Sequence, residues 1–114
     1  MKLRNRYLPS FLYASTLGSV MLWWQQPLIA TASLLAIGIL LNWNTRWQLL
    51  RVYLVFALAG SLSEILAIWS GAWSYGLPQL FGIPIWLPLV WGNSSLLLAE
   101  LIHRYGQDLP DEEA

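Results

Sequence analysis

Residues 49–69 read LLRVYLVFALAGSLSEILAIW. A helix rises about 1.5 Å per residue, so a helix of this length spans a hydrocarbon core of about 30 Å, and we expect it to cross a membrane. The acidic residue inside the stretch, Glu64, would cost on the order of 2.5–3.5 kcal/mol at the bilayer centre, and such residues usually face the interior of a bundle. We therefore expect Glu64 to lie among helices rather than against lipid.

The composition of the whole chain indicates the same class of protein. Hydrophobic residues make up 57% and charged residues 11% of the 114 residues, against about 45–50% and about 25% in soluble domains. The mean hydropathy is +0.52. The chain is therefore expected to be an integral membrane protein, with the lipid bilayer as its first partner.

Four apolar runs are long enough for membrane spans, and no linker divides them into separate domains. They predict an all-α fold, an integral membrane four-helix bundle that forms a single transmembrane domain over residues 1–114. The first run is longer than the core of a signal peptide and does not end in a small-residue cleavage site, so we expect it to be retained. The expected spans cover residues 7–24, 27–42, 49–69 and 83–102, approximately, and residues 107–114 form an acidic tail.

The positive charges predict an orientation in the membrane. Arg46 and Arg51 lie between the second and third spans, and the other Lys and Arg residues precede the first span or follow the fourth. All 6 therefore fall on one side of the predicted bundle, and the positive-inside rule places that side in the cytoplasm. Both termini are expected to be cytoplasmic, with the links at Gln25-Gln26 and at residues 70–82 on the far side.

The third span has two faces at helical spacing. Small residues and Glu64 share one stripe, while Leu54, Leu58 and Leu62 lie on the opposite side. Small residues let helices approach closely in lipid, where no hydrophobic force drives helices together, so we expect the first stripe to face protein. The predicted packing residues are Ala57, Gly60, Ser61, Ala67 and Gly71.

Glu64 is the leading candidate for a functional group. Either it is a protonated carboxyl that hydrogen-bonds to a neighbour, because burial disfavours the charged form, or it carries protons, acts as a general acid or binds a cation. The link that follows is rich in aromatic residues, and the fourth span carries tryptophans and an amide that either bonds across helices or joins the site. The candidate ligand-binding residues are Glu64, Trp73, Tyr75, Trp86, Trp91 and Asn93.

Two prolines shape the expected start of the fourth span. Pro84 suits the first helical turn, and Pro88 has no N–H with which to bond back to the Pro84 carbonyl. That carbonyl is then expected to be a free acceptor near Glu64. Toward the other end of the span, Glu100 precedes Arg104 by four residues, which predicts a local ion pair near the cytoplasmic surface.

The composition also argues against several kinds of site. The chain has no cysteine and a single histidine, so we expect no metal site and no cofactor. A formal net charge of zero provides no basic surface for nucleic acid. There is no evident nucleophile–base pair or phosphate-binding loop, so a non-enzymatic protein is expected rather than an enzyme.

The chain resembles small uncharacterised bacterial four-span membrane proteins. The resemblance lies in the order of Glu64, the segment 71–75 (GAWSY) and the segment 82–91 (GIPIWLPLVW). That resemblance implies a multi-pass protein of a bacterial inner (plasma) membrane. Over about a quarter of the chain, the same segments are similar to the carotenoid hydratase and cyclase-like membrane family, whose members are longer and have more spans. The second resemblance implies that Glu64 protonates a polyene double bond, with Trp73, Tyr75 and Trp91 beside the resulting cation.

Two functions therefore stay open. The first is an accessory or structural subunit of a membrane assembly, or an oligomeric bundle, whose partners are other membrane subunits or copies of itself. It fits the short links and the small number of candidate catalytic groups. The second is a transporter or a lipid- or polyene-handling protein that uses Glu64 in an aromatic outer-leaflet site for an apolar or cationic ligand.

Overall fold

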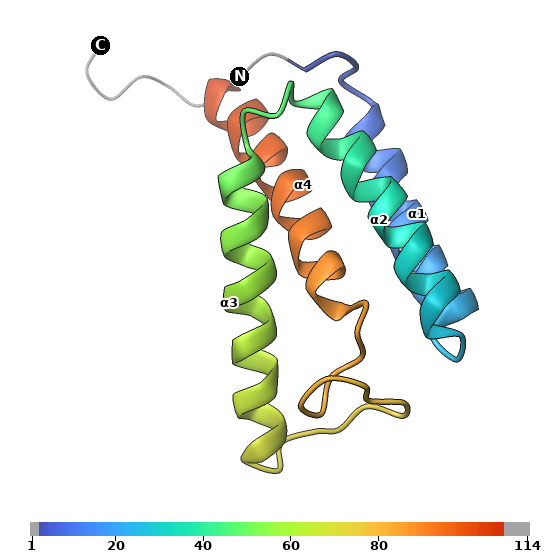
Figure 1. Cartoon of the computed structure of the whole chain (residues 1–114). Coiled ribbons are helices and arrows are strands. Elements are labelled where there is room, and N and C mark those ends of the chain that lie inside the picture. The colour runs from blue at the N-terminus through green and yellow to red at the C-terminus, as the bar shows by residue number, and fades with distance from the viewer. Residues whose placement is uncertain (1–2, 109–114) are drawn as a thin grey trace.

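Between residues 3 and 108 the chain folds into four α-helices, described here from a computed structural model (Figure 1). Side chains are described up to Arg104, and residues 109–114 of the predicted acidic tail lie outside the described residues. The prediction of an all-α, four-helix fold is confirmed. The helices are α1 (Leu8–Trp23), α2 (Pro27–Asn44), α3 (Leu50–Trp69) and α4 (Leu87–Asp108).

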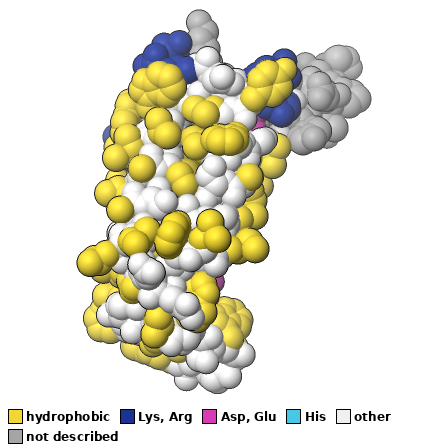
Figure 2. Space-filling view, turned by 90° about the vertical axis from the view of Figure 1, so that its right-hand side faces the viewer, with side chains coloured by type: hydrophobic (Ala, Val, Ile, Leu, Met, Phe, Trp, Pro, Cys, Tyr) yellow, Lys and Arg dark blue, Asp and Glu magenta, His cyan; other side chains and the backbone are white. Residues whose placement is uncertain are grey.

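The fourth helix is central to the arrangement. α4 packs against α1, α2 and α3, whereas α3 packs chiefly on α4, and α1 pairs with α2. The start of α1, the α2–α3 link and the last turns of α4 lie together at one end, and the other two connections lie at the opposite end (Figure 1). The described arginine side chains gather at the first end (Figure 2). We call these two ends the arginine end and the loop end.

The end of α3 is set by a glycine. Gly71 has a φ of +88°, a conformation that glycine adopts at no steric cost. Its N–H bonds to the carbonyl of Ile68 at 3.0 Å, and the N–H of Ala72 bonds to the carbonyl of Ala67 at 3.0 Å, which together make a Schellman motif. Gly71 is thus exposed beyond the helix, and a Cβ built on it would meet no atom within 4 Å, so it does not pack against another helix of this chain as predicted.

The start of α4 differs from the expectation. The helix begins at Leu87 rather than at Ile83, and the N–H of Leu87 bonds to the Pro84 carbonyl at 3.1 Å. The predicted free acceptor at Pro84 is therefore wrong, because a turn before the helix supplies a donor for it. Pro88 lies in the first turn of α4, where a helix needs no N–H.

The interior combines apolar and polar side chains, while much of the outer surface is apolar. Large hydrophobic side chains stand exposed on every helix, for example Leu28 at 84%, Met21 at 77% and Leu66 at 65%. Hydrophobic side chains are spread over the whole length of the face seen in Figure 2. By length and composition, α2 and α3 are suited to crossing a membrane. The buried apolar residues are Leu12, Ala30, Leu34, Ile37, Leu41, Tyr53, Ile83, Trp86, Leu87 and Leu96.

Candidate functional site

The carboxylate of Glu64 receives two hydrogen bonds from the aromatic loop, by which we mean residues 70–86. Nε1 of Trp73 and the hydroxyl of Tyr75 each donate to Oε2 at 2.9 Å. No described residue donates to the other carboxylate oxygen. The turn at Gly71 directs the chain back along α3. Trp73 and Tyr75 therefore reach Glu64, which lies more than one turn before the end of the helix. The fold thus brings three of the predicted ligand candidates together.

These three residues, the Glu64 cluster, lie at the surface of the loop end. Trp73 is 50% exposed, and Glu64 and Tyr75 are half-buried. Burial, the hydrogen bond to Glu64 and the charge of Glu64 raise the pKa of Tyr75 from 10.0 to about 12. The phenol therefore keeps its proton and acts as a donor. Glu64 was expected to lie among the helices, but both of its hydrogen-bond partners come from the loop.

The cluster has the chemistry of a cation or proton site. One carboxylate oxygen receives no described hydrogen bond, so it can accept a proton or approach a cation. The half-exposed indole ring of Trp73 offers a face that attracts cations. Among the described residues, however, no group of three or more acidic or histidine side chains could hold a metal ion.

The two candidate tryptophans near the start of α4 are not bonded to Glu64. Trp91 packs against Gly60, because a Cβ added at Gly60 would come within 2.1 Å of its Cδ2 atom. It therefore contributes to the contact between α3 and α4. Trp86 is 5% exposed and lines a cavity that Tyr75 also lines. It is next to the Glu64 cluster but makes no hydrogen bond to it.

Asn93 is the polar centre of the bundle and is fully buried. Its Oδ1 accepts a hydrogen bond of 2.6 Å from the hydroxyl of Tyr53 in α3. Its Nδ2 lies 3.3 Å from Oγ1 of Thr16 in α1 and 3.2 Å from the carbonyl of Leu34 in α2. One side chain of α4 thus bonds to all three other helices. Ser95, two residues further on, donates to the Gly92 carbonyl of its own helix.

Two glycines make room for the Tyr53 ring. A Cβ at Gly92 would lie 2.5 Å from Cε1 of Tyr53, and a Cβ at Gly38 would lie 2.4 Å from its hydroxyl oxygen. Since real Cβ atoms do not approach so closely, these positions fit only glycine with the ring in place. The glycines therefore allow Tyr53 to reach Asn93.

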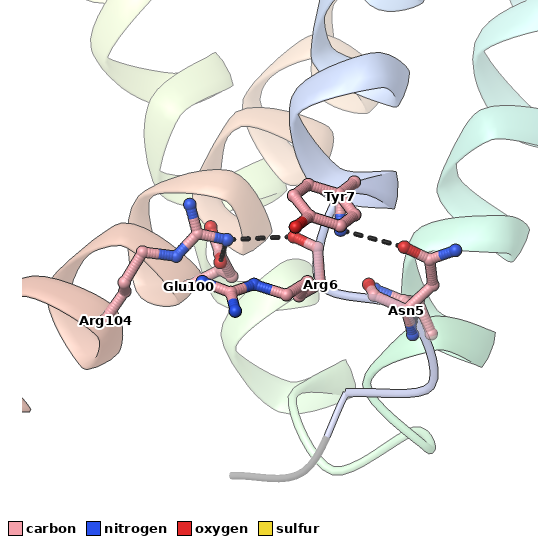
Figure 3. A network of polar contacts seen from close by, with 6 residues as sticks. Asn5, Arg6, Tyr7, Glu100 and Arg104 are labelled. Carbon is pink, nitrogen blue, oxygen red and sulfur yellow. Dashed lines mark hydrogen bonds and ion pairs between the residues drawn. The ribbon is translucent and has the colours of Figure 1, made fainter.

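A second polar network closes the arginine end (Figure 3). The predicted ion pair is present: Arg104 contacts the carboxylate of Glu100, which is 2% exposed. Nη2 of Arg104 also donates to the carbonyl of Arg6 at 2.9 Å. Asn44 accepts from the N–H of Asn5 at 2.8 Å and donates to the carbonyl of the same residue at 3.0 Å. These bonds tie the segment before α1 to α2 and α4.

Sequence reasoning missed three of the residues that organise these networks. Thr16 and Tyr53 are polar groups within apolar runs, and that signal could have singled them out as partners for Asn93. Asn44 gave no such signal, because it lies in a polar link in the sequence. Its role depends on a segment 39 residues away in the chain.

Comparisons with known proteins provide no relative for this chain. No family model, no curated protein and no solved structure matches it.

Proposed function

We propose that this chain is a four-span integral membrane protein and serves as a structural or accessory subunit, through association with copies of itself or with other membrane subunits. The membrane location is supported by the surface of α2 and α3. In their apolar windows only 39% and 17% of the residues are buried, whereas an apolar core helix of a soluble protein is mostly buried. Such a surface is stable against lipid and unstable in water.

The distribution of charge supports the predicted orientation. The described arginines gather at one end of the bundle (Figure 2), and the positive-inside rule assigns such an end to the cytoplasm. With both termini there, the aromatic loop lies on the outer face of a bacterial inner membrane. The exposed tryptophans of the loop end, such as Trp69 at 71% and Trp73 at 50%, suit a membrane–water interface.

The observation that carries the subunit role is the open groove between α2 and α3. Because α3 packs chiefly on α4, a hollow of about 260 Å³ stays open between the two helices, lined by Leu35, Ile39 and Leu54 among others. Asn42 also lines this hollow. Its Oδ1 is buried and has no hydrogen-bond partner among the described residues. A further helix seated there would cover the hollow and could supply a donor to that oxygen.

Cysteine cross-linking in membranes tests this role, since the chain has no cysteine of its own. Leu54→Cys places a thiol at the groove, and Leu17→Cys, on α1 and similarly exposed, is the control. We expect oxidation to link Leu54→Cys chains into dimers, or to a co-purifying subunit, and to leave Leu17→Cys chains unlinked. A monomer in mild detergent, with no groove cross-link and no co-purifying protein, would refute the proposal.

The Glu64 cluster supports a second candidate function, the handling of an apolar or cationic ligand at the outer face. The specific observation is that one carboxylate lies beside two aromatic side chains and keeps one oxygen without a described hydrogen bond. This would suit transport, or the polyene chemistry implied by the resemblance to the carotenoid enzymes. Trp91 packs at the α3–α4 contact, so in that case the cation would be flanked by Trp73 and Tyr75.

Glu64→Gln separates the two functions. The amide oxygen can still accept from Trp73 and Tyr75, so the loop should stay in place while the charge is lost. A charge-dependent function predicts loss of cation-dependent transport or of polyene conversion, with normal membrane insertion. If the variant behaves as the parent protein at every pH tested, Glu64 serves only to hold the loop. Leu66→Gln, on the exposed face of α3, controls for an added amide.

A further inference from the structure

One of the residues that line a cavity at the loop end, Trp86, has an unsatisfied donor. The cavity has a volume of about 210 Å³ and lies between the end of α1 and the aromatic loop, lined by Val20, Trp24, Tyr75, Gly76, Pro84 and Trp86, among others. The indole N–H of Trp86 is buried and has no hydrogen-bond partner among the described residues. A buried donor without an acceptor costs about 1–3 kcal/mol, so such a group calls for a partner.

The residues that line the cavity select the charge of that partner. None of them carries a charge, and Tyr75, in its wall, is hydrogen-bonded to the carboxylate of Glu64. An anionic phosphate or free carboxylate would find no cation here and would feel repulsion from Glu64. A neutral carbonyl oxygen is therefore the acceptor that fits.

The size and position of the cavity indicate which kind of molecule it can bind. A volume of about 210 Å³ is smaller than the roughly 300–1,000 Å³ of sites that enclose a whole ligand, so it suits part of a larger molecule. Under the proposed membrane location it lies among the interfacial tryptophans, at the depth where lipid headgroups meet acyl chains. Ester carbonyls of glycerolipids are at that depth and are followed by apolar chains.

We propose that this cavity binds the ester carbonyl and first methylene groups of an outer-leaflet glycerolipid, with the indole N–H of Trp86 donating to the carbonyl oxygen. The proposal rests on the proposed membrane location but not on the subunit role. It assigns Trp86 and Tyr75 to a lipid site that adjoins the Glu64 cluster through Tyr75. Val20 lines the site from the α1 side.

The test uses the full chain, with its tryptophans labelled with nitrogen-15, in an alkyl maltoside detergent that has no carbonyl group. The probes are a short-chain diacyl phosphatidylcholine and the dialkyl ether lipid of the same headgroup and chain length. Trp86→Phe removes one indole resonance and so identifies the Trp86 signal. We expect the diester to shift that signal saturably at one lipid per chain, and the ether lipid to leave it unchanged.

Two further variants locate the binding. Val20→Phe fills the cavity and should abolish the shift while the Trp86 signal is retained, whereas Leu22→Phe, exposed on the same helix, should keep the shift. If Val20→Phe does not fold, lipid binding by Trp86→Phe is measured instead, from the lipid retained in native mass spectra. The affinity of this variant for the diester should fall on the order of five- to tenfold, and its affinity for the ether lipid should not change.

Several outcomes would overturn the lipid site. They are equal shifts with both lipids, no saturable shift, a shift with a free fatty acid alone, or a diester affinity unchanged in Trp86→Phe. Alkaline extraction of membranes tests the membrane location separately. A chain that resists extraction but shows no ester-specific shift refutes this site alone, whereas a chain released by alkali refutes the proposed location.

Discussion

The hydroxyl of Tyr53 donates a 2.6 Å hydrogen bond to Oδ1 of Asn93, at a point where both side chains are buried. This bond joins α3 to α4, and the amide of the same Asn93 joins α4 to α1 and α2. Under the proposed membrane location, helices gain little from apolar contact in lipid, so such bonds and close packing hold them together. Asn93 is accordingly a structural residue, although its position also made it a candidate for ligand binding.

Asn93→Ala should lower the free energy of unfolding by about 2 kcal/mol or more. It removes three hydrogen bonds, each worth about 0.6 kcal/mol on average in membrane proteins, and leaves the Tyr53 hydroxyl buried without an acceptor. Tyr53→Phe removes one bond and should cost less. Unfolding in mixed micelles measures both, and the double variant should be less destabilised than the sum. Additive losses would contradict a shared network.

Gly60→Ala should push α3 away from α4. The added Cβ would meet the Trp91 ring at 2.1 Å, and overpacking of this kind costs about 1–3 kcal/mol. Gly18→Ala is the matched control, because nothing lies within 4 Å of the added Cβ, and alanine favours a helix over glycine by up to about 1 kcal/mol. Thermal unfolding of the two variants in detergent should therefore shift in opposite directions. Equal shifts would show that the Gly60–Trp91 contact does not limit packing.

Gly71→Ala should destabilise the end of α3 by about 1–2 kcal/mol, because an alanine is strained at the left-handed φ of +88°. A steric clash is not the cause, since a Cβ at this position would meet no atom within 4 Å. Gly71→Asn should lose less, as asparagine tolerates this conformation. Unfolding experiments measure the loss, and the indole signal of Trp73 reports whether the loop leaves Glu64. Equal losses for Ala and Asn would argue against backbone strain as the cause.

Tyr75 should make stability fall between about pH 10 and pH 12. Burial and the neighbouring Glu64 raise its pKa from the ordinary value of 10.0 to about 12 in the folded chain, so the folded state binds the phenolic proton more tightly in this window. Stability that is fully present below pH 10 is then lost as the pH rises through 12. Ultraviolet absorbance of tyrosinate should show that the late-titrating part of the curve is reduced in Tyr75→Phe. Tyr75→Phe should also flatten the pH dependence of unfolding, and an unchanged profile would contradict the assignment.

Asn44→Leu should free the segment before α1. Asn44 bonds both the N–H and the carbonyl of Asn5, so its loss should speed proteolysis before Tyr7 several-fold. Asn42→Leu is the control, because the Asn42 amide donates only within its own helix, to Gly38. Time courses with a broad-specificity protease in detergent measure the rates. Equal cleavage of the two variants would show that the Asn44 bonds do not restrain the segment.

The helices themselves could be predicted from the sequence. Expected spans at residues 7–24, 27–42 and 49–69 correspond to α1, α2 and α3 within two residues at each end, because long apolar runs bounded by proline or polar residues define helices locally. The ion pair of Glu100 and Arg104 followed from spacing within one helix. α4 was the exception, since its start depends on a turn whose hydrogen bonds run across the aromatic loop.

The candidate site was only partly predictable. Glu64, Trp73 and Tyr75 were chosen for their chemistry, but sequence alone could not show that the loop turns back to bond the carboxylate. Trp91 and Asn93 were chosen on the same grounds, yet Trp91 packs at the α3–α4 contact and Asn93 lies at the polar centre of the bundle. Which residues share a site depends on the path of residues 70–86, which no local pattern specifies.

The amino-acid order alone was enough for the number of helices, the apolar character of their surfaces and the gathering of arginines at one end, because these follow from residue type and from neighbours close in the chain. Only the folded arrangement decided the partners of Asn93, which come from positions up to 77 residues away, and the burial of the Trp86 N–H, which has no partner among the described residues. Such contacts arise when packing brings distant segments within hydrogen-bond distance, so the spacing of residues along the chain does not predict them.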